Sequence, residues 1–401
     1  MTFSTRERST TMRVLVLCER VGEEGGMETY LRTVLPALVA AGDDVQIAAR
    51  FVDDANAFGA QAEQVAWSDE HDAPSLVAAA TVGRIADRFL PDVVLAENVL
   101  DAAVLGRAFD RPAVRIYGVH DHRPFCPNGD RRYPQGGGIC TAPMGAACTW
   151  HALVHGCAYG PRAATTRLVT TRRAVLRAIR RADAVLTLSP FMAAIARAHG
   201  ISSNSLHVIA PPLANDAYAS SPMPRPAADT VLFAGRLVPS KGCRTLLAAL
   251  ARLPRRQRPL LVVAGEGPEL EATIAQAERD EISMRWLGRC DPSAMRAAYD
   301  AATLVAMPSL WAEPFGLVGI EAFARGRPVV AFSVGAIPDW IGGAGVAVHR
   351  GDEAALAQGM ADLLAQTAWG RASQAALLQA QGYRLVTHIE ALHRIFAGRV
   401  A

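Results

Sequence analysis

Two cations lie in VLFAGRLVPSKG, a stretch that has the pattern of a buried strand followed by a glycine-containing turn. Arg236 and Lys241 occupy the turn, and the helical pattern RTLLAALARL follows them. The first N–H groups of a helix have no partner within the helix and carry partial positive charge, so a helix N-terminus attracts anions. Two cationic side chains beside such a terminus suit a diphosphate. The alternative is an ordinary basic turn whose charges are solvated.

Two glutamates in WAEPFGLVGIEAFARGRPVVA, residues 311–331, form the second candidate group. Pro314 and Gly316 predict that Glu313 lies in a loop and that a helix begins near Gly316. A carboxylate close to a helix N-terminus suits the paired hydroxyl groups of a ribose or another sugar. The alternative is that both glutamates are ordinary charges at a helix start. The expected cleft is lined by both carboxylates and the first amides of the helix, which are Glu313, Phe315, Gly316, Leu317 and Glu321.

The elements that must position these residues alternate between strand and helix. The first ordered run, MRVLVLCE at residues 12–19, is apolar and bounded by turn residues, as a buried parallel strand is. A turn with Gly25 and Gly26 follows, and a helical pattern then runs from Glu28 to Ala41. Further strand patterns at 44–50, 91–97, 112–120, 182–189 and 206–212 predict a doubly wound α/β domain over residues 12–210.

The composition changes at residues 211–228, PPLANDAYASSPMPRPAA, where five prolines without periodicity predict an exposed linker. Strand patterns TVLFAG, PLLVVAGEG, SMRWLG, ATLVAMP and RPVVAF then restart the alternation in a second domain, residues 229–382. The expected fold class is α/β, with two Rossmann-like domains facing each other across a ligand-binding cleft. The closing stretch, 383–401, has a helical pattern and is expected to cross back onto the first domain.

Composition disfavours several other classes of protein. The 401 residues are 51% hydrophobic and 20% charged, which is the balance of a packed globular protein. The 41 Lys and Arg nearly cancel the 38 Asp and Glu, which disfavours nucleic acid as a partner. No apolar run approaches the roughly 18 residues of a membrane span. Residues 1–11 lack an apolar segment, so a disordered leader is expected there. Seven unevenly spread cysteines do not suit a disulfide scaffold, so we expect a cytoplasmic protein.

The two motifs together resemble a known family. G-R-x4-K-G followed by E-P-F-G-x4-E is similar to the pattern of family 4 of the retaining glycosyltransferases, which have the two-domain GT-B fold. The resemblance covers nearly the whole ordered chain. GEEGGMETYLRTVLPALVAAGDDV resembles the first glycine-rich loop and helix of that family. AGEGPELEATIAQA and WLGRC resemble its nucleotide-base region, and GVHD resembles the part that carries its first-domain histidine.

The resemblance implies a role for each matched residue. Arg236 and Lys241 would hold the donor diphosphate and neutralise the charge on the leaving nucleotide. Glu321 would hold the ribose hydroxyls, while Glu313 and the amides of 315–317 would hold the transferred sugar. His120 would contact that sugar and help to position the acceptor; the alternative is a hydrogen-bonded histidine at a strand end. The remaining donor-binding residues implied are Gly25, Gly26, Glu266 and Leu287.

The implied reaction moves a sugar from a UDP-, GDP- or ADP-sugar to a glycan, lipid-linked or small-molecule acceptor. It retains the anomeric configuration without an enzyme nucleophile, so catalysis would rest on orientation and on stabilising the leaving diphosphate. No D-x-D occurs in the chain, so cations and helix N-termini are expected to replace a catalytic metal and no cofactor is required. The alternatives are a non-catalytic nucleotide-sugar-binding module and a nucleotide-sugar epimerase of the same fold. An NAD-dependent enzyme is disfavoured because the first turn lacks G-x-G-x-x-G.

A cysteine-bearing loop at residues 120–160 follows the histidine. Four of the seven cysteines fall within 32 residues there, in a stretch rich in Gly and Pro with little apolar content. Such a loop cannot be held by a hydrophobic core and needs a cross-link, which a structural zinc ion or disulfides would supply. The spacings, with thirteen, seven and eight intervening residues, differ from the close pairs of a zinc finger. We expect one zinc ion, with the ligands Cys126, Cys140, Cys148 and Cys157; the alternative is that these cysteines are free or form disulfides.

The next stretch, PRAATTRLVTTRRAVLRAIRRADAV, has the pattern of a basic amphipathic helix. Such a helix can lie on anionic lipid, which makes peripheral contact with the inner face of a membrane a candidate property. The alternative is a packed surface helix with solvated arginines. The arginines expected on it are Arg167, Arg172, Arg173, Arg177, Arg180 and Arg181.

Overall fold

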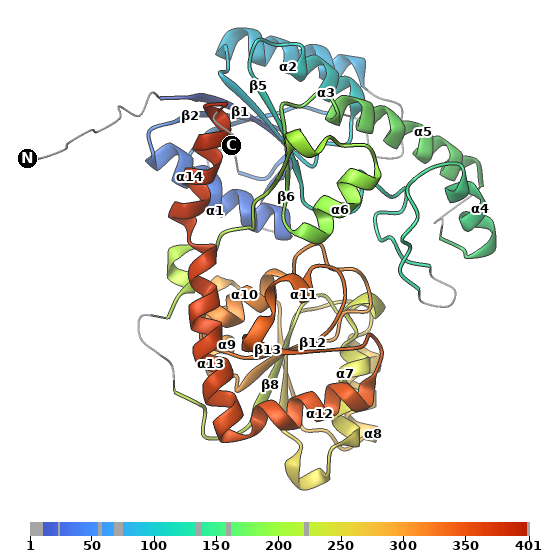
Figure 1. Cartoon of the computed structure of the whole chain (residues 1–401), viewed down its shortest axis with the longest axis vertical. Coiled ribbons are helices and arrows are strands. Elements are labelled where there is room, and N and C mark those ends of the chain that lie inside the picture. The colour runs from blue at the N-terminus through green and yellow to red at the C-terminus, as the bar shows by residue number, and fades with distance from the viewer. Residues whose placement is uncertain are drawn as a thin grey trace, which may run out of the picture.

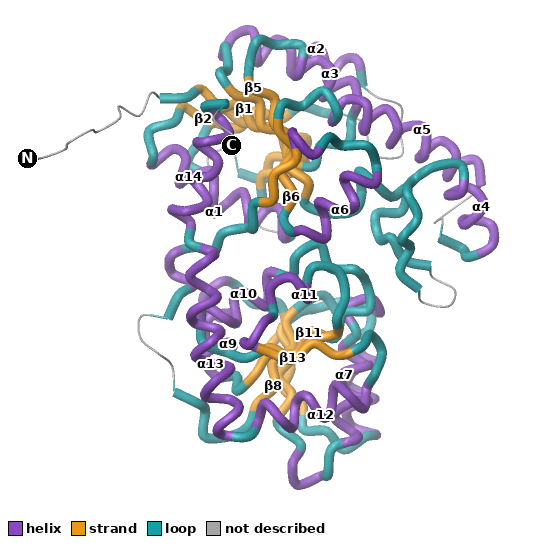
Figure 2. The backbone as a smooth tube through the Cα atoms, viewed as in Figure 1, coloured by secondary structure: helices purple, strands orange, loops and turns teal. Residues whose placement is uncertain are grey.

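The computed structural model describes residues 11–22, 25–54, 58–67, 75–133, 138–157, 162–219 and 224–398. Almost all of the predicted leader therefore lies outside the described residues, as do parts of the cysteine-bearing loop and of the linker. The described chain forms two α/β domains, one above the other in Figure 1, each built round a parallel sheet. Figure 2 shows the two sheets enclosed by helices.

The first domain is built on a parallel sheet with the strand order β3-β2-β1-β4-β5-β6-β7. Its strands are short and apolar because helices cover both faces of the sheet, as parallel sheets require. The chain reverses its direction of winding between β1 and β4, and ligands of such sheets bind at this point. The strands are β1 (Arg13–Val21), β2 (Asp44–Val52), β3 (Gln61–Gln64), β4 (Val93–Glu97), β5 (Val114–Val119), β6 (Ala184–Thr187) and β7 (Leu206–Val208).

The helices of the first domain begin and end at recognisable capping residues. Ser189 caps α6 by accepting a hydrogen bond from the Met192 amide, and Pro190 occupies the first turn. Asp101 caps α3 in the same way. Gly42, with a φ of 101°, follows the end of α1. The helices are α1 (Gly26–Ala40), α2 (Leu76–Phe89), α3 (Ala102–Phe109), α4 (Ala147–Val154), α5 (Arg162–Ile179) and α6 (Pro190–Ala198).

The basic helix α5 corrects the sequence interpretation in two respects. It ends at Ile179, so Arg180 and Arg181 lie beyond it and bind the His199 carbonyl and Asp110 respectively. Arg172 is fully buried and therefore does not belong to a solvent-facing charged stripe. Among the described residues, no helix is long and apolar enough to cross a membrane.

The second domain repeats the same winding, with the order β10-β9-β8-β11-β12-β13. Its strands are β8 (Thr230–Ala234), β9 (Leu260–Ala264), β10 (Met284–Gly288), β11 (Leu304–Met307), β12 (Val329–Phe332) and β13 (Gly345–Val348). Its helices are α7 (Cys243–Arg252), α8 (Leu270–Arg279), α9 (Pro292–Ala301), α10 (Leu317–Ala324), α11 (Ile337–Trp340), α12 (Glu353–Leu364) and α13 (Gln366–Ala380).

The last helix, α14 (Leu385–Phe396), belongs to the core of the first domain although it follows the second. It lies beside α1 and buries Ile389 and Leu392 against that core (Figure 1). On the same helix, His388 Nε2 lies 3.1 Å from the Tyr30 hydroxyl and Nδ1 lies 2.9 Å from the Ala210 carbonyl. Burial lowers the pKa of His388 to about 4, so this histidine joins α14, α1 and the residue before the linker as a neutral group.

The linker is not uniformly exposed, contrary to the expectation from its prolines. Residues 211–213 are buried, because Leu213 packs on the core of the second domain and its amide donates to the Tyr383 carbonyl over 2.9 Å. The two domains also touch directly. His122 Nε2 lies 2.7 Å from the Ala312 carbonyl, and the Ser189 hydroxyl donates to the Pro314 carbonyl over 2.8 Å.

Candidate functional site

A cavity of about 540 Å³ lies between the domains, where the carboxyl ends of both sheets meet. Residues of α1 and α10 and of the loops after β5, β8 and β11 line it. Most of the residues that the sequence singled out for donor binding share this cavity, namely Gly25, Gly26, His120, Arg236, Lys241, Glu313, Phe315, Gly316 and Leu317. They come from positions up to about 290 residues apart in the chain.

Two helix N-termini from opposite domains meet at this cavity. The helix α10 begins at Leu317 after Gly316, whose φ of 97° favours glycine, so the predicted helix start is confirmed. Across the cleft, α1 begins at Gly26 after Gly25, whose φ is 111°. A Cβ atom on Gly26 would lie 3.8 Å from Leu317 Cδ1, so the two helix starts are in near contact. Unpaired N–H groups of both helices are therefore available to one anion.

An ion pair joins the cation and the carboxylate that the sequence placed in separate motifs. Lys241 Nζ lies 2.7 Å from Glu313 Oε1, and the Ser309 hydroxyl donates to the same oxygen over 2.5 Å. Glu313 is only 5% exposed. Burial alone would raise the pKa of Glu313, but the attraction of Lys241 and the bonds from Lys241 and Ser309 outweigh it and lower that pKa. Glu313 is thus ionised in the cleft.

The two cations of the site differ in their surroundings. Lys241 is the only lysine in the chain, which otherwise uses arginine, and its Nζ also lies 5.0 Å from the centre of the Trp311 ring. Arg236 is exposed and forms no ion pair with the described residues. The Lys241 ammonium is therefore held in place by protein groups, whereas the Arg236 guanidinium can reorient toward a ligand.

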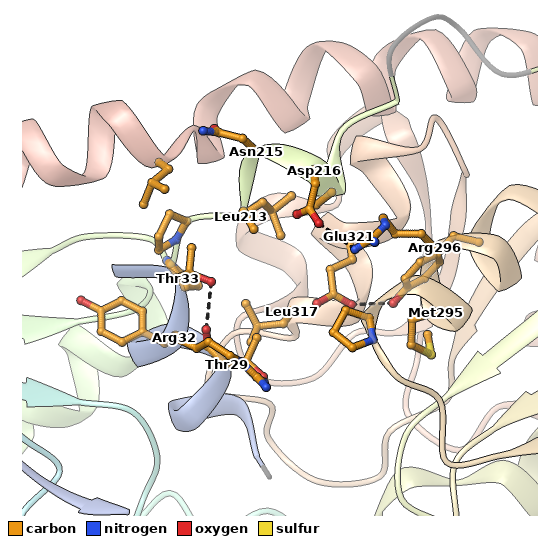
Figure 3. Close-up of a pocket in the computed structure, with 18 of the residues that line it drawn as sticks. Thr29, Arg32, Thr33, Leu213, Asn215, Asp216, Met295, Arg296, Leu317 and Glu321 are labelled. Carbon is orange, nitrogen blue, oxygen red and sulfur yellow. Dashed lines mark hydrogen bonds and ion pairs between the residues drawn. The ribbon is translucent and has the colours of Figure 1, made fainter. Parts of the chain in front are cut away.

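Glu321 lines a second and larger cavity of about 810 Å³ (Figure 3). This cavity shares Tyr30, Pro211 and Leu317 with the first. The Tyr299 hydroxyl donates to Glu321 Oε2 over 2.7 Å. Burial raises the pKa of Glu321 despite that hydrogen bond. The linker and α1 form the opposite wall, where Figure 3 shows Thr29 and Thr33 of α1. The two glutamates thus lie in adjoining cavities that Leu317 separates.

Glu266 and Leu287, the residues expected beside the nucleotide base, line neither cavity. Leu287 lies in the edge strand β10, and Glu266 lies in the loop after β9 with Oε1 3.7 Å from a Cβ built on Gly288. The residues that follow β10, Arg289 and Cys290, do reach the cavity of Glu321. The structure therefore brings the end of β10 to the site, but not these two side chains.

His120 is held by a buried carboxylate that the sequence interpretation missed. Its Nε2 lies 2.7 Å from Oε2 of Glu97, a residue that is 1% exposed. Glu97 ends β4 and pairs with Gly118 of the neighbouring strand β5, where a Cβ atom would collide with Oε2. The Tyr30 ring packs on the imidazole at 4.8 Å between centres. The sequence contained one indication of this contact. Glu97 ends β4 and His120 follows β5, and the carboxyl ends of adjacent parallel strands lie side by side.

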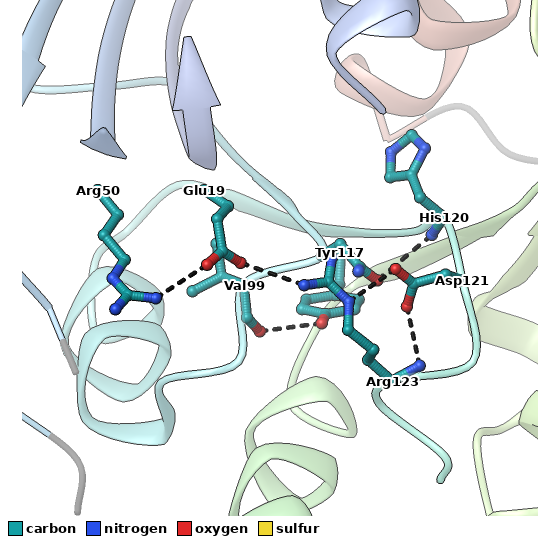
Figure 4. A network of polar contacts seen from close by, with 8 residues as sticks. Glu19, Arg50, Val99, Tyr117, His120, Asp121 and Arg123 are labelled. Atoms are coloured by element: carbon teal, nitrogen blue, oxygen red, sulfur yellow. Dashed lines mark hydrogen bonds and ion pairs between the residues drawn. The ribbon is translucent and has the colours of Figure 1, made fainter. Parts of the chain in front are cut away.

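Asp121 and its partners form a polar network behind His120 (Figure 4). The backbone amide and Nε of Arg123 donate to Asp121 over 2.8 and 2.7 Å. Arg123 also pairs with Glu19 of β1, which in turn pairs with Arg50 of β2. Burial opposes ionisation of Asp121, but Arg123 and its hydrogen bonds lower the pKa of that carboxyl. The network ties the start of the cysteine-bearing loop to the sheet.

The four cysteines of that loop line one small cavity of about 30 Å³ together with His151. Among the described residues, no group of three or more His, Cys, Asp or Glu side chains is already arranged to hold a metal ion. All four cysteines are free thiols. The zinc site therefore stays a prediction.

Two Rossmann-like domains that face each other across an anion-attracting cleft define the GT-B class of fold. A family model described as Glycosyltransferase Family 4 matches residues 24–214, and one described as Glycosyl transferases group 1 matches residues 228–366. Together these matches cover most of the chain, which belongs to the family 4, group 1 glycosyltransferases.

Solved structures support the fold. Anabaena Alr3699/HepE in complex with UDP has a TM-score of 0.73 at 20% identity, covering 96% of this chain and 100% of that one. A glycosyltransferase from Rickettsia africae has a TM-score of 0.74 at 13% identity, covering 97% and 99%.

Curated relatives are similar over a shorter stretch. A D-inositol 3-phosphate glycosyltransferase of Segniliparus rotundus is 44% identical over 122 residues, which cover 28% of this chain and 26% of that protein. The glycogen synthase of Mycobacterium tuberculosis is 35% identical over 147 residues, 35% of each chain. The matches thus span about a third or less of these relatives.

The two glutamates are expected to give different phenotypes. Glu321→Gln should weaken binding of the nucleotide itself about tenfold or more, because a bond to an ionised group contributes about 1.5–3 kcal/mol. Glu313→Gln should leave nucleotide binding in place and weaken binding of the sugar-bearing donor. Calorimetric titration of UDP and UDP-glucose, or of the GDP or ADP pair that binds, measures both effects.

A pH series supplies the control for Glu321. Because burial raises the pKa of Glu321, its carboxylate protonates earlier than an ordinary glutamate as pH falls, and nucleotide affinity should fall with it. Glu321→Gln should lose this part of the pH dependence. Reversed phenotypes, with Glu313→Gln weakening the nucleotide and Glu321→Gln sparing it, would show that the roles are assigned wrongly.

Proposed function

We propose that the protein transfers a sugar from a nucleotide diphosphate donor to an acceptor, with retention of configuration and without a metal ion. The observation that carries this proposal is the cavity between α1 and α10, where Lys241, Arg236 and two helix N-termini surround one space. These groups suit a diphosphate, and Glu313 beside them suits the hydroxyl groups of a sugar. Helix N-termini and fixed cations can stabilise the departing diphosphate in place of a metal.

The choice of donor rests on similar structures. HepE has been solved with UDP, with UDP and glucose, and with UDP-glucose, and its fold covers 96% of this chain. A uridine nucleotide sugar is therefore the first donor to test, with GDP- and ADP-sugars as the alternatives. Glu321 suits the ribose that all three have in common, so it does not distinguish between them.

The carboxylates in the cleft favour a retaining reaction without an enzyme nucleophile over a retaining double displacement. Glu313 is bound by Lys241 and Ser309, and Asp121 is bound by Arg123, so both are engaged by cations. Neither is poised to attack the sugar as a nucleophile. In the proposed step the bond to the diphosphate breaks and the acceptor oxygen bonds to the anomeric carbon on the same face, which retains the configuration, while the acceptor proton passes to the leaving diphosphate oxygen. His120, oriented by Glu97, would hold the sugar during this step.

Turnover with an identified donor tests the proposal. A thermal-shift screen of nucleotides and nucleotide sugars identifies the donor, since a ligand at 100 times its dissociation constant stabilises a protein by about 2.7 kcal/mol. Donor and candidate acceptors are then incubated with the protein in excess EDTA, and the anomeric configuration of the product is read by proton NMR. We expect nucleotide release, a product with the configuration of the donor, and no loss of rate with EDTA.

Each rival activity gives a different result in the same assay. An inverted product contradicts retention, and a rate that vanishes with EDTA and returns with Mg²⁺ or Mn²⁺ contradicts metal independence. Nucleotide release that needs no acceptor, with a rearranged sugar, would indicate an epimerase. Tight donor binding without turnover of any acceptor would indicate a binding module.

We also propose that the neighbouring helices α4 and α5 contact an anionic membrane surface. Trp150 on α4 is 62% exposed, while Arg167, Arg173 and Arg177 on α5 are exposed and have no ion pair among the described residues. Exposed aromatic and cationic side chains favour a lipid interface. The protein should sediment with vesicles that contain anionic lipid but not with neutral ones. A triple arginine-to-glutamine variant that sediments equally well would contradict this contact.

A further inference from the structure

The described part of the segment between β5 and α5 packs on the core of the first domain at Phe125 and Met144 and on that of the second domain at Ile139. The Phe125 side chain is only 1% exposed. Between these anchors a short antiparallel bridge joins Arg132 to Ile139, and the Cys140 amide donates to the Arg131 carbonyl over 2.6 Å. The segment is rich in Gly and Pro and has little apolar content, so a bound metal ion would stabilise its fold.

The four cysteines of the segment converge although they come from separate stretches of chain. Cys126 follows Phe125, Cys140 lies on the returning arm, Cys148 is in α4 and Cys157 follows that helix. All four line the cavity of about 30 Å³, which has room for an occupant the size of one ion or water molecule.

Backbone and side-chain groups around the cavity favour negative charge on the sulfurs. The Gly145 amide donates to Cys148 Sγ over 3.4 Å. Arg131 also lines the cavity, is 5% exposed and has no ion pair with a described carboxylate. A buried guanidinium without a counter-charge is costly, so its position calls for an anionic partner. Arg132 lines the same cavity, and its Nε is buried without a hydrogen bond.

We propose that Cys126, Cys140, Cys148 and Cys157 bind one structural zinc ion. Four thiolates match the tetrahedral preference of zinc and leave no open position for chemistry. Zinc with four thiolates carries a net charge of −2, which supplies the counter-charge that Arg131 and Arg132 require. Because no three ligands are already arranged for a metal among the described residues, binding has to draw the thiols inward.

Zinc binding would affect the cleft because the segment that supplies the four cysteines begins at a residue of the cleft. The segment begins at His120, and two residues later His122 contacts the Ala312 carbonyl of the second domain. Metal binding contributes its free energy to the folding of the residues that supply the ligands. Zinc would therefore order the segment that carries the cleft histidine and one of the contacts between domains.

Metal analysis of the full chain, purified without a histidine tag, tests the proposal. We expect about one zinc per chain, and one equivalent bound when zinc is titrated into the chelator-stripped, reduced protein against a chromophoric chelator. Cys126→Ser and Cys148→Ser should each lower zinc affinity at least tenfold. Cys290→Ser, which changes a half-buried cysteine outside the segment, should bind zinc like the unchanged chain, and His151→Ala should do the same.

Two further readouts keep the test decisive. Zinc should slow hydrogen exchange in residues 120–157 while exchange in α7–α13 stays unchanged, and this comparison also shows that the serine variants remain folded. Absence of zinc binding to the reduced protein would overturn the proposal, as would disulfides among these four cysteines in the purified chain. Loss of zinc in His151→Ala with retention in the cysteine variants would overturn the four-thiolate ligand set.

Discussion

The two domains bring positive charge together at the cleft, and this repulsion must be balanced by negative charge. The N-termini of α1 and α10 each carry about half a positive elementary charge and nearly touch at Gly26 and Leu317. Lys241 adds a full charge beside them. An anion between the two domains would relieve this repulsion, and the diphosphate of the proposed donor is such an anion.

Glu313 is an anion that the chain itself supplies beside Lys241. Its ion pair neutralises the ammonium of Lys241, and a hydrogen bond from Ser309 fixes the orientation of the carboxylate. An incoming diphosphate would compete with Glu313 for Lys241, while Arg236 is available without breaking an ion pair with any described residue. In our account Lys241 shifts toward the phosphate, and this shift leaves Glu313 oxygens able to accept bonds from the sugar. One ion pair thus couples binding of the nucleotide to binding of the sugar.

Much of the fold could be predicted because it depends on local pattern. The apolar runs indicated the strands, and Pro314 with Gly316 indicated the start of α10. These are properties of a few consecutive residues. The motif of Arg236 and Lys241 was readable for the same reason, since its chemistry is contained in one turn.

What the sequence did not reveal depends on contacts between distant segments. Glu97 holds His120 only because β4 and β5 are neighbours in the sheet, and sheet order is not a local property. Tyr299 reaches Glu321 from another helix, and Arg172 is buried although its helix is strongly basic. The prolines of the linker suggested exposure, but Leu213 is covered by the segment at Tyr383, which lies 170 residues further along the chain.

Lys241 is the only lysine in the chain, so its reactivity toward an amine-directed reagent shows directly whether it contacts the diphosphate. An amine-directed reagent can label only Lys241 and the chain N-terminus, and the N-terminal amine serves as the internal control in peptide mass spectrometry. We expect the nucleoside diphosphate to slow labelling of Lys241 strongly, whereas the matching nucleoside at the same fractional occupancy should not slow it. Equal protection by nucleoside and nucleoside diphosphate, or no protection by either at saturation, would contradict the assignment of Lys241 to the diphosphate.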